Sequence, residues 1–63
     1  MTPNQYRAAL EKLGLSQRGA GLFLGVDERT SRRWALGEAP IPETVAKLLR
    51  LMVKLELKPE DVK

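Results

Sequence analysis

The 63-residue chain has no cysteine and no histidine. Without cysteine there are no disulfide bonds, thiolate nucleophiles or cysteine-based zinc sites, and without histidine the commonest general base and metal ligand is missing. The eight acidic residues are scattered, and no glycine-rich phosphate loop accompanies them. We therefore expect no enzyme active site, no metal, no cofactor and no small-molecule substrate.

Long apolar runs and targeting signals are also missing. The longest nearly apolar run, residues 20–26, contains two glycines and is far shorter than the ~20 residues that span a bilayer. The first residues, Met-Thr-Pro-Asn-Gln, lack the basic and apolar regions of a signal peptide. These absences predict a cytoplasmic protein without membrane contact.

The composition is that of a single small globular domain. Hydrophobic residues make up 43% of the chain and charged residues 30%, which excludes a disordered chain. A chain this short buries only roughly 60% of its unfolded surface, so its stability is marginal. The 11 basic and 8 acidic residues leave a net charge of +3, which points weakly to a polyanionic partner.

Capping residues and glycines divide the chain into four helical segments. Thr2, Pro3 and Gln5 form the pattern of a capping box at the start of the first helix. The predicted helices cover residues 3–13, 17–24, 28–36 and 42 to about 57, with Ser16 and Asp27 as N-caps. Residues 59–61 could begin one more helical turn, but the sequence leaves few residues to complete it. No segment alternates with period two over a strand's length, so we predict an all-α fold.

Residues 17–36 have the spacing of a helix-turn-helix unit. Such a unit needs a small residue where its helices cross and a glycine in the turn, and Gly21 and Gly25 stand at these places. Its inward apolar side chains would be Ala20, Leu24, Val26 and Trp34, with Phe23 and Leu15 nearby. Each feature is common alone, whereas the spacing of all of them is specific.

The second helix of this unit has two different faces. At about 100° per residue, one face carries Trp34, Thr30 and Ser31. The other, an arc of roughly 140°, carries Glu28, Arg29, Arg32, Arg33 and Leu36. Guanidinium groups match the O6 and N7 acceptors of guanine and also pair with phosphate. Two of the three surplus positive charges fall within residues 17–36, so the charge coincides with the arginine face.

Five short segments lie within and around this unit. They are Leu15-Ser16-Gln17, Leu24-Gly25-Val26, Arg32-Arg33-Trp34, Gly37-Glu38 and Pro40-Ile41-Pro42. Together they resemble the phage-repressor/Cro-like (XRE-type) helix-turn-helix family over about residues 10–52. The resemblance implies one lambda-repressor-like domain of four or five helices across residues 1–63. It also implies a small bacterial transcription regulator that binds double-stranded DNA with its third helix in the major groove.

The resemblance implies a role for each matching residue. The residues facing DNA bases would be Glu28, Arg29 and Arg33. The residues contacting phosphate would be Ser16, Gln17, Thr30 and Arg32, with Gly37 and Glu38 approaching phosphate through main-chain amides. Three of these roles have alternatives. A carboxylate at residue 28 also suits the helix N-terminus, Arg32 also fits a solvated surface position, and Ser16 serves first as a helix cap.

The sequence departs from the family pattern at several positions. Ser31 stands where the family usually has valine or isoleucine, which predicts a thinner apolar contact between the paired helices. Leu22, Ala35 and Leu36 stand where it often has polar residues, which predicts a less polar surface. That surface supports a second interpretation, a protein-interaction module of antitoxin-like or assembly type that docks through Leu22, Leu36 and the fourth helix.

The fourth helix carries more apolar residues than one buried face needs. Its core stripe consists of Ile41, Val45, Leu48, Leu49, Met52 and Leu55, and Leu51 and Val53 widen it on both flanks. Packing in the centre of the domain explains the stripe. A homodimer that binds two half-sites would also use the surplus edge, and the sequence leaves both interpretations open.

Overall fold

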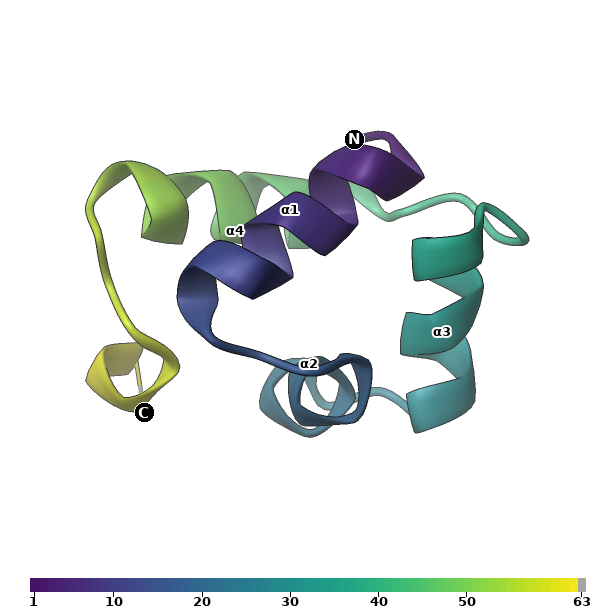
Figure 1. Cartoon of the computed structure of the whole chain (residues 1–63), viewed down its shortest axis with the longest axis horizontal. Helices are drawn as coiled ribbons and strands as arrows, with labels where there is room; N and C mark the ends of the chain where they lie inside the picture. Colours follow the sequence, from purple (N-terminus) through teal and green to yellow (C-terminus); the bar gives the residue numbers. More distant parts are fainter. Residues whose placement is uncertain (63) are drawn as a thin grey trace.

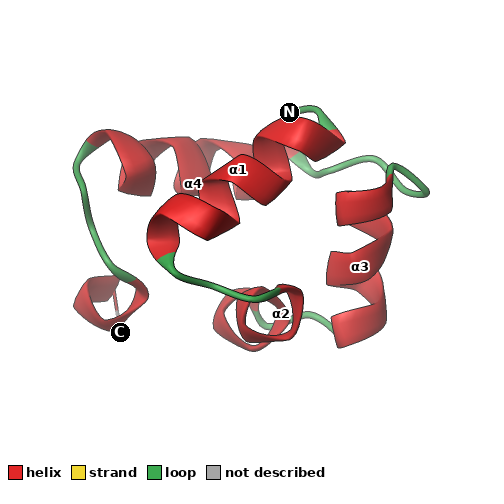
Figure 2. Ribbon diagram, viewed as in Figure 1, coloured by secondary structure: helices red, strands yellow, loops and turns green. Residues whose placement is uncertain are grey.

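Four α-helices and one 3-10 helix follow one another in the computed structural model, which describes residues 1–62. They are α1 (Pro3–Leu13), α2 (Gln17–Leu24), α3 (Glu28–Leu36), α4 (Glu43–Lys54) and the 3-10 helix η1 (Pro59–Val62). No strand occurs within the described residues, so the all-α prediction is confirmed (Figure 2).

The first two helices begin with side-chain caps. The Gln5 amide donates to the Thr2 hydroxyl at 3.1 Å, and the Thr2 amide donates to the Gln5 side chain at 2.9 Å, which completes the predicted capping box. The Ser16 hydroxyl accepts from the Gly19 amide at 2.9 Å. Asp27 occupies the N-cap position of α3, but its carboxylate accepts no hydrogen bond there. The prediction of a side-chain cap by Asp27 is therefore wrong, since this exposed carboxylate stays in solvent.

The helices end in left-handed residues. Gly14, Gly25 and Gly37 have φ values of 72°, 75° and 78°, as their positions predict. The fourth helix ends differently, because Glu56 takes a φ of 56° and the Leu57 amide donates to the Met52 carbonyl at 2.8 Å. The helix therefore stops at Lys54, and the predicted extension to about residue 57 is wrong. No glycine marks this end in the sequence.

The core lies where α1 meets α3 and α4. In Figure 1, α1 crosses in front of α4, α2 is seen end on below them, and α3 stands upright at one side. Tyr6, Leu49 and Met52 are fully buried. The rings of Tyr6 and Trp34 meet edge to face with centroids 5.9 Å apart, so Trp34 is the core anchor that the sequence predicts.

Two sequence expectations about α3 need correction. Ser31 is fully buried, and its hydroxyl lies 2.7 Å from the Tyr6 hydroxyl, so a polar contact stands where a thin apolar one was expected. Valine or isoleucine would leave the Tyr6 hydroxyl without this partner. Ala35 is also fully buried, so it belongs to the core and adds nothing to the apolar surface.

The chain after α4 also differs from expectation. Leu55, placed in the core stripe by the sequence, is 56% exposed because the helix has already ended. Leu57 packs against the core instead. The further turn that residues 59–61 could begin is present as η1. The Lys58 amide donates to the Asp61 carboxylate at 3.0 Å and closes this turn.

Candidate nucleic-acid interface

A close backbone contact sets how α2 meets α3. A Cβ atom at Gly21 would lie 3.1 Å from the Val26 carbonyl oxygen and 3.3 Å from that of Asp27. These are backbone atoms with little freedom to move, so only glycine fits without displacement. The Val26 amide also donates to the Gly21 carbonyl at 2.9 Å, which tightens the turn. The start of α3 is thereby held directly against the middle of α2, as the spacing of the unit predicts.

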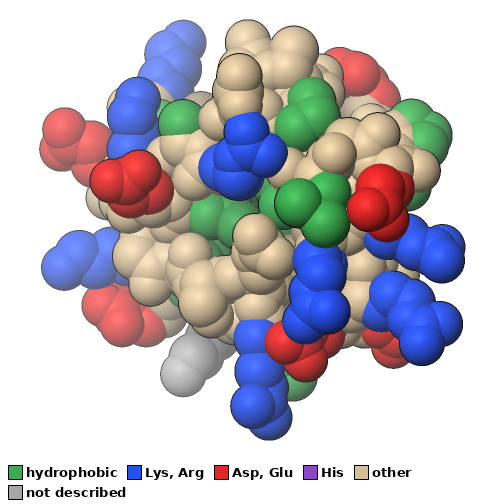
Figure 3. Space-filling model, turned by 45° about the vertical axis from the view of Figure 1, so that its right-hand side comes forward, with side chains coloured by type: hydrophobic (Ala, Val, Ile, Leu, Met, Phe, Trp, Pro, Cys, Tyr) green, Lys and Arg blue, Asp and Glu red, His purple; other side chains and the backbone are tan. Residues whose placement is uncertain are grey.

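The outer face of α3 is exposed and largely basic. Ser31, Trp34 and Ala35 face the core. The exposed residues are Glu28, Arg29, Arg32, Arg33 and Leu36. Figure 3 turns this side of the molecule forward and shows basic side chains along its right and lower parts, with acidic side chains among them and apolar side chains above them. The helical arithmetic therefore separated the two faces of α3 correctly.

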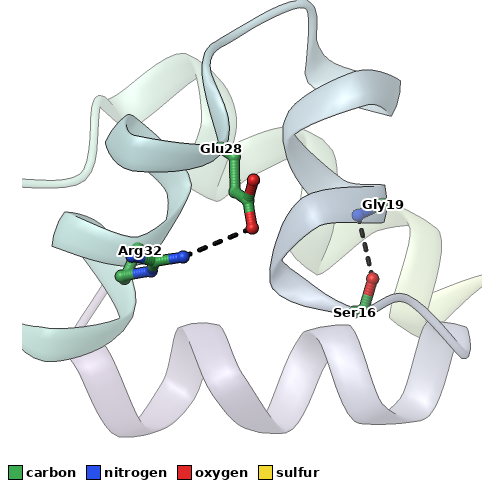
Figure 4. A network of polar contacts seen from close by, with 4 residues as sticks. All are labelled: Ser16, Gly19, Glu28 and Arg32. Carbon is green, nitrogen blue, oxygen red and sulfur yellow. Dashed lines mark hydrogen bonds and ion pairs between the residues drawn. The ribbon is translucent and has the colours of Figure 1, made fainter.

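Two charges on this face pair with each other. The Arg32 guanidinium lies 3.3 Å from the Glu28 carboxylate, one turn away along α3, and both side chains are more than half exposed (Figure 4). Such a surface ion pair contributes about 0.3–0.5 kcal/mol, so a phosphate can replace the carboxylate at little cost. Arg29 and Arg33 make no ion pair within residues 1–62. They are the unneutralised charges of the face.

The start of α2 offers hydrogen-bond donors. The Ser16 hydroxyl oxygen is occupied by the Gly19 amide (Figure 4), but the hydroxyl still has a proton to donate. Gln17 is half-buried at the first position of the helix, and its amide makes no hydrogen bond within residues 1–62. Free amides and the helix dipole make such a terminus attractive to anions.

The residues after α3 are arranged differently from the expectation. The Gly37 amide donates to the Trp34 carbonyl at 3.3 Å, and the Glu38 amide donates to the Arg33 carbonyl at 2.8 Å. Both amides are engaged in closing the helix, so they are not free to bind phosphate. Thr30, the remaining phosphate candidate on α3, is half-buried.

One contact that positions α3 escaped the sequence analysis. The Arg7 guanidinium donates to the Ala35 carbonyl near the end of α3 and to the Asn4 side chain. A guanidinium at a helix C-terminus satisfies an otherwise unpaired carbonyl and suits the helix dipole. The spacing of Asn4 and Arg7 on one helix face was readable in the sequence, whereas the partner on α3 was not.

Apolar side chains are also exposed on α2 and on α3. Leu22 on α2 is 76% exposed and Leu36 on α3 is 58% exposed. These two side chains confirm that part of the expected apolar surface exists. They are a feature that DNA binding alone does not require.

The described residues contain no group of three or more acidic side chains close enough to hold a metal ion. None of their helices combines the length and the apolar character needed to cross a bilayer. No family model, curated protein or solved structure matches this chain.

Proposed function

We propose that this chain binds double-stranded DNA in a sequence-specific manner, with α3 in the major groove. The observation that carries the proposal is the exposed face of α3, where Arg29 and Arg33 make no ion pair with the described residues and lie opposite a buried Trp34. An α-helix fits the major groove, and an anchored helix with outward guanidinium groups can read base edges there. The small bacterial regulators of the phage-repressor/Cro-like type use this arrangement, and the sequence resemblance supports the same role here.

The proposed roles follow from the position and partners of each side chain. Arg29 and Arg33 pair with guanine acceptors, and Arg32 exchanges Glu28 for a phosphate oxygen. Glu28, once released, accepts from cytosine or remains at the helix start. The start of α2, with Ser16 and Gln17, binds backbone phosphate. Thr30 makes a minor phosphate contact, whereas the amides of Gly37 and Glu38, which already close α3, make none.

The proposal is tested by selecting bound sequences from a random DNA pool at near-physiological salt, followed by affinity measurements on the enriched site. Replacing Arg33 by alanine should cost about 1–3 kcal/mol and relax the preference at one base position. Lys47→Ala removes one positive charge from the exposed surface of α4 and serves as the matched control. Equal losses in the two variants, or no enriched sequence, would refute base reading by Arg33.

A second candidate function is protein docking through the apolar side chains near α3. The exposure of Leu22 and Leu36 favours it. DNA binding weakens steeply with added salt because counterions are released, whereas an apolar interface responds little. Binding that persists unchanged as salt is raised would favour this antitoxin-like or assembly role over DNA binding.

The proposed regulator would act as a homodimer if α4 supplies a seam. Leu51, in the last turn of α4, is 51% exposed, and Leu55, which follows the helix as its C-cap, is 56% exposed. A two-fold dimer reads two half-sites about one DNA turn apart. A palindromic consensus in the selection experiment would support the dimer, and a single half-site would support a monomer.

A further inference from the structure

A shallow groove runs between α1 and α4, with a volume of about 320 Å³. Its apolar floor includes Ala8, Ala9 and Val53, and its rim carries Lys12, Arg50 and Lys54. We refer to these six residues as the basic groove. A second hollow of about 460 Å³ shares Lys12 and Val53 with it and continues towards Leu57. The depression therefore follows most of the length of α1, which is about 16 Å.

Within residues 1–62, the charged side chains that line the basic groove are all positive, and Met1 and Gln5 complete its lining. The adjoining hollow carries both signs, because Glu56 lines it together with Lys12 and Lys58. Lys12 and Lys54 make no ion pair within residues 1–62, and Arg50 has only a long contact of 3.6 Å with the exposed Glu43. Lys12 and Lys54 lie in the last turns of α1 and α4, where a positive charge interacts favourably with the helix dipole. That interaction does not explain the apolar floor between the two lysines.

The basic groove lies apart from the candidate DNA interface. On α1, Arg7 points to α3, where it binds the Ala35 carbonyl. Ala8 and Lys12 lie about 100–140° around the helix from Arg7, on the flank that meets α4. A ligand in the groove therefore occupies a different side of α1 from the one that supports α3.

We propose that the basic groove docks an acidic amphipathic helix of a partner protein. The groove is open, so a small ligand would leave much of its surface in water, whereas a helix can lie along it. Apolar residues at spacings of three and four would contact the floor. Aspartate and glutamate on both sides of that stripe would face the three cations of the rim. This proposal does not depend on DNA binding.

The test uses the isotope-labelled chain and a synthetic amphipathic peptide with leucine on one face and glutamate on its flanks. Titration followed by nuclear magnetic resonance should shift the amide signals of Ala8, Lys12, Val53 and Lys54. The signals of the arginines on α3 should stay in place. A peptide of the same composition in scrambled order, which has no apolar face, should bind much more weakly.

Charge reversal on the rim gives the matched comparison. The double variant K12E/K54E should weaken binding of the peptide about tenfold, because two attractions become repulsions. Lys47 also lies on α4 and is exposed, but it does not line the groove. K47E should therefore change the affinity by less than about twofold.

A neutral variant tests the floor independently of charge. Ala8 is exposed and helical, so A8Q keeps a good helix former and fills the groove without cutting into the core. A8Q should weaken the peptide as K12E/K54E does, and circular dichroism should confirm that both variants are folded. If one variant does not fold, the proposal is tested with the other variant and with the amide shifts that the peptide causes in the unmodified chain.

Several outcomes would overturn the proposal. They are equal effects of K47E and K12E/K54E, equal binding of the scrambled peptide, shifts confined to α3, or no shifts at millimolar peptide. Vesicles of phosphatidylcholine with and without phosphatidylglycerol provide the remaining arm. Binding to the anionic vesicles through Lys12 and Lys54, without binding of the peptide, would identify a membrane surface as the ligand and reject the partner helix.

Discussion

The pair α2–α3 and the pair α1–α4 are held together in opposite ways. Large side chains fill the core on the α4 side, where Leu49 and Met52 are completely buried. In α2 the only buried residues are Ala20 and Gly21, and Gly21 lies close to backbone atoms of the following turn. Large buried side chains hold α1 and α4 together. The helices α2 and α3 can approach closely because Gly21 has no side chain.

This difference suits what each pair does. A backbone contact allows little change in angle, so the outer face of α3 is aimed reproducibly while its exposed residues remain free to be polar. A contact made of large side chains buries apolar area, and such burial dominates the stability of a small domain. The α1–α4 pair therefore stabilises the domain, and the α2–α3 pair orients its candidate interface.

Three contacts join the two pairs through α1. The Tyr6 hydroxyl meets Ser31, the Tyr6 ring meets Trp34, and Arg7 binds the Ala35 carbonyl. All three connect the first half of α1 with α3. The orientation of α3 consequently depends on α1 as well as on α2.

The largest expected effect comes from removing volume in the α1–α4 pair. Leu49→Ala should lower the free energy of unfolding by about 3 kcal/mol, through lost burial and the cavity left behind. That is a large part of the roughly 3–9 kcal/mol expected for this chain length. Urea unfolding measures the loss. Leu49→Met, which conserves volume, should cost less than about 1.5 kcal/mol, and an equal loss would contradict a packing explanation.

The next effect comes from adding volume in the α2–α3 pair. Gly21→Val should destabilise by about 2 kcal/mol, because its side chain meets the Val26 and Asp27 carbonyls. Thermal unfolding should show a midpoint about 10 °C lower. Gly19→Val is the control in the same helix, since a Cβ at Gly19 meets only side-chain atoms of Ser16 and Leu15. If both variants lose the same stability, the close backbone contact is not the cause.

The smallest effect concerns the contact between the pairs and depends on pH. Tyr6→Phe leaves the buried Ser31 hydroxyl without its partner and should cost about 1 kcal/mol at neutral pH. Burial raises the pKa of the Tyr6 hydroxyl above its usual 10.0, and the hydrogen bond with Ser31 opposes this shift in part. The neutral form is therefore favoured by folding.

The sign of the pH dependence follows from that shift. Above pH 10.0 the unfolded chain loses the Tyr6 proton first, so stability from this group is complete below pH 10.0 and is lost as the pH rises through the higher pKa of the folded state. Urea unfolding below and above pH 10 should show a gap between the unmodified chain and Tyr6→Phe that narrows with pH. A gap that stays constant would mean that Tyr6 does not titrate differently on folding.

Much of the fold could be predicted because its signals are local. The capping box at Thr2, the cap at Ser16 and the glycines after α1, α2 and α3 each act within a few residues. The end of α4 could not be predicted, because Glu56 adopts a left-handed conformation that its residue type disfavours. Leu57 then packs against the core, a contact that is not local.

In the candidate site, too, local features could be predicted from the sequence, and features that depend on distant residues could not. Helical spacing predicted which residues of α3 face outward, since that depends only on the helix period. It did not reveal the Ser31–Tyr6 contact or the burial of Ala35, because both depend on α1. The engagement of the Gly37 and Glu38 amides is local, and the left-handed glycine already contained that signal.

By itself the sequence determined the four helices, their all-α class, and an arginine face on α3, because caps, glycines and a 3.6-residue period operate within one or two turns of chain. Only the tertiary structure decided which of these faces meet. It placed Tyr6 against Ser31, Arg7 at the end of α3, and the lysines of α1 and α4 on the rim of one groove. Such contacts join residues far apart in the chain, and their partners are set by packing of the whole domain.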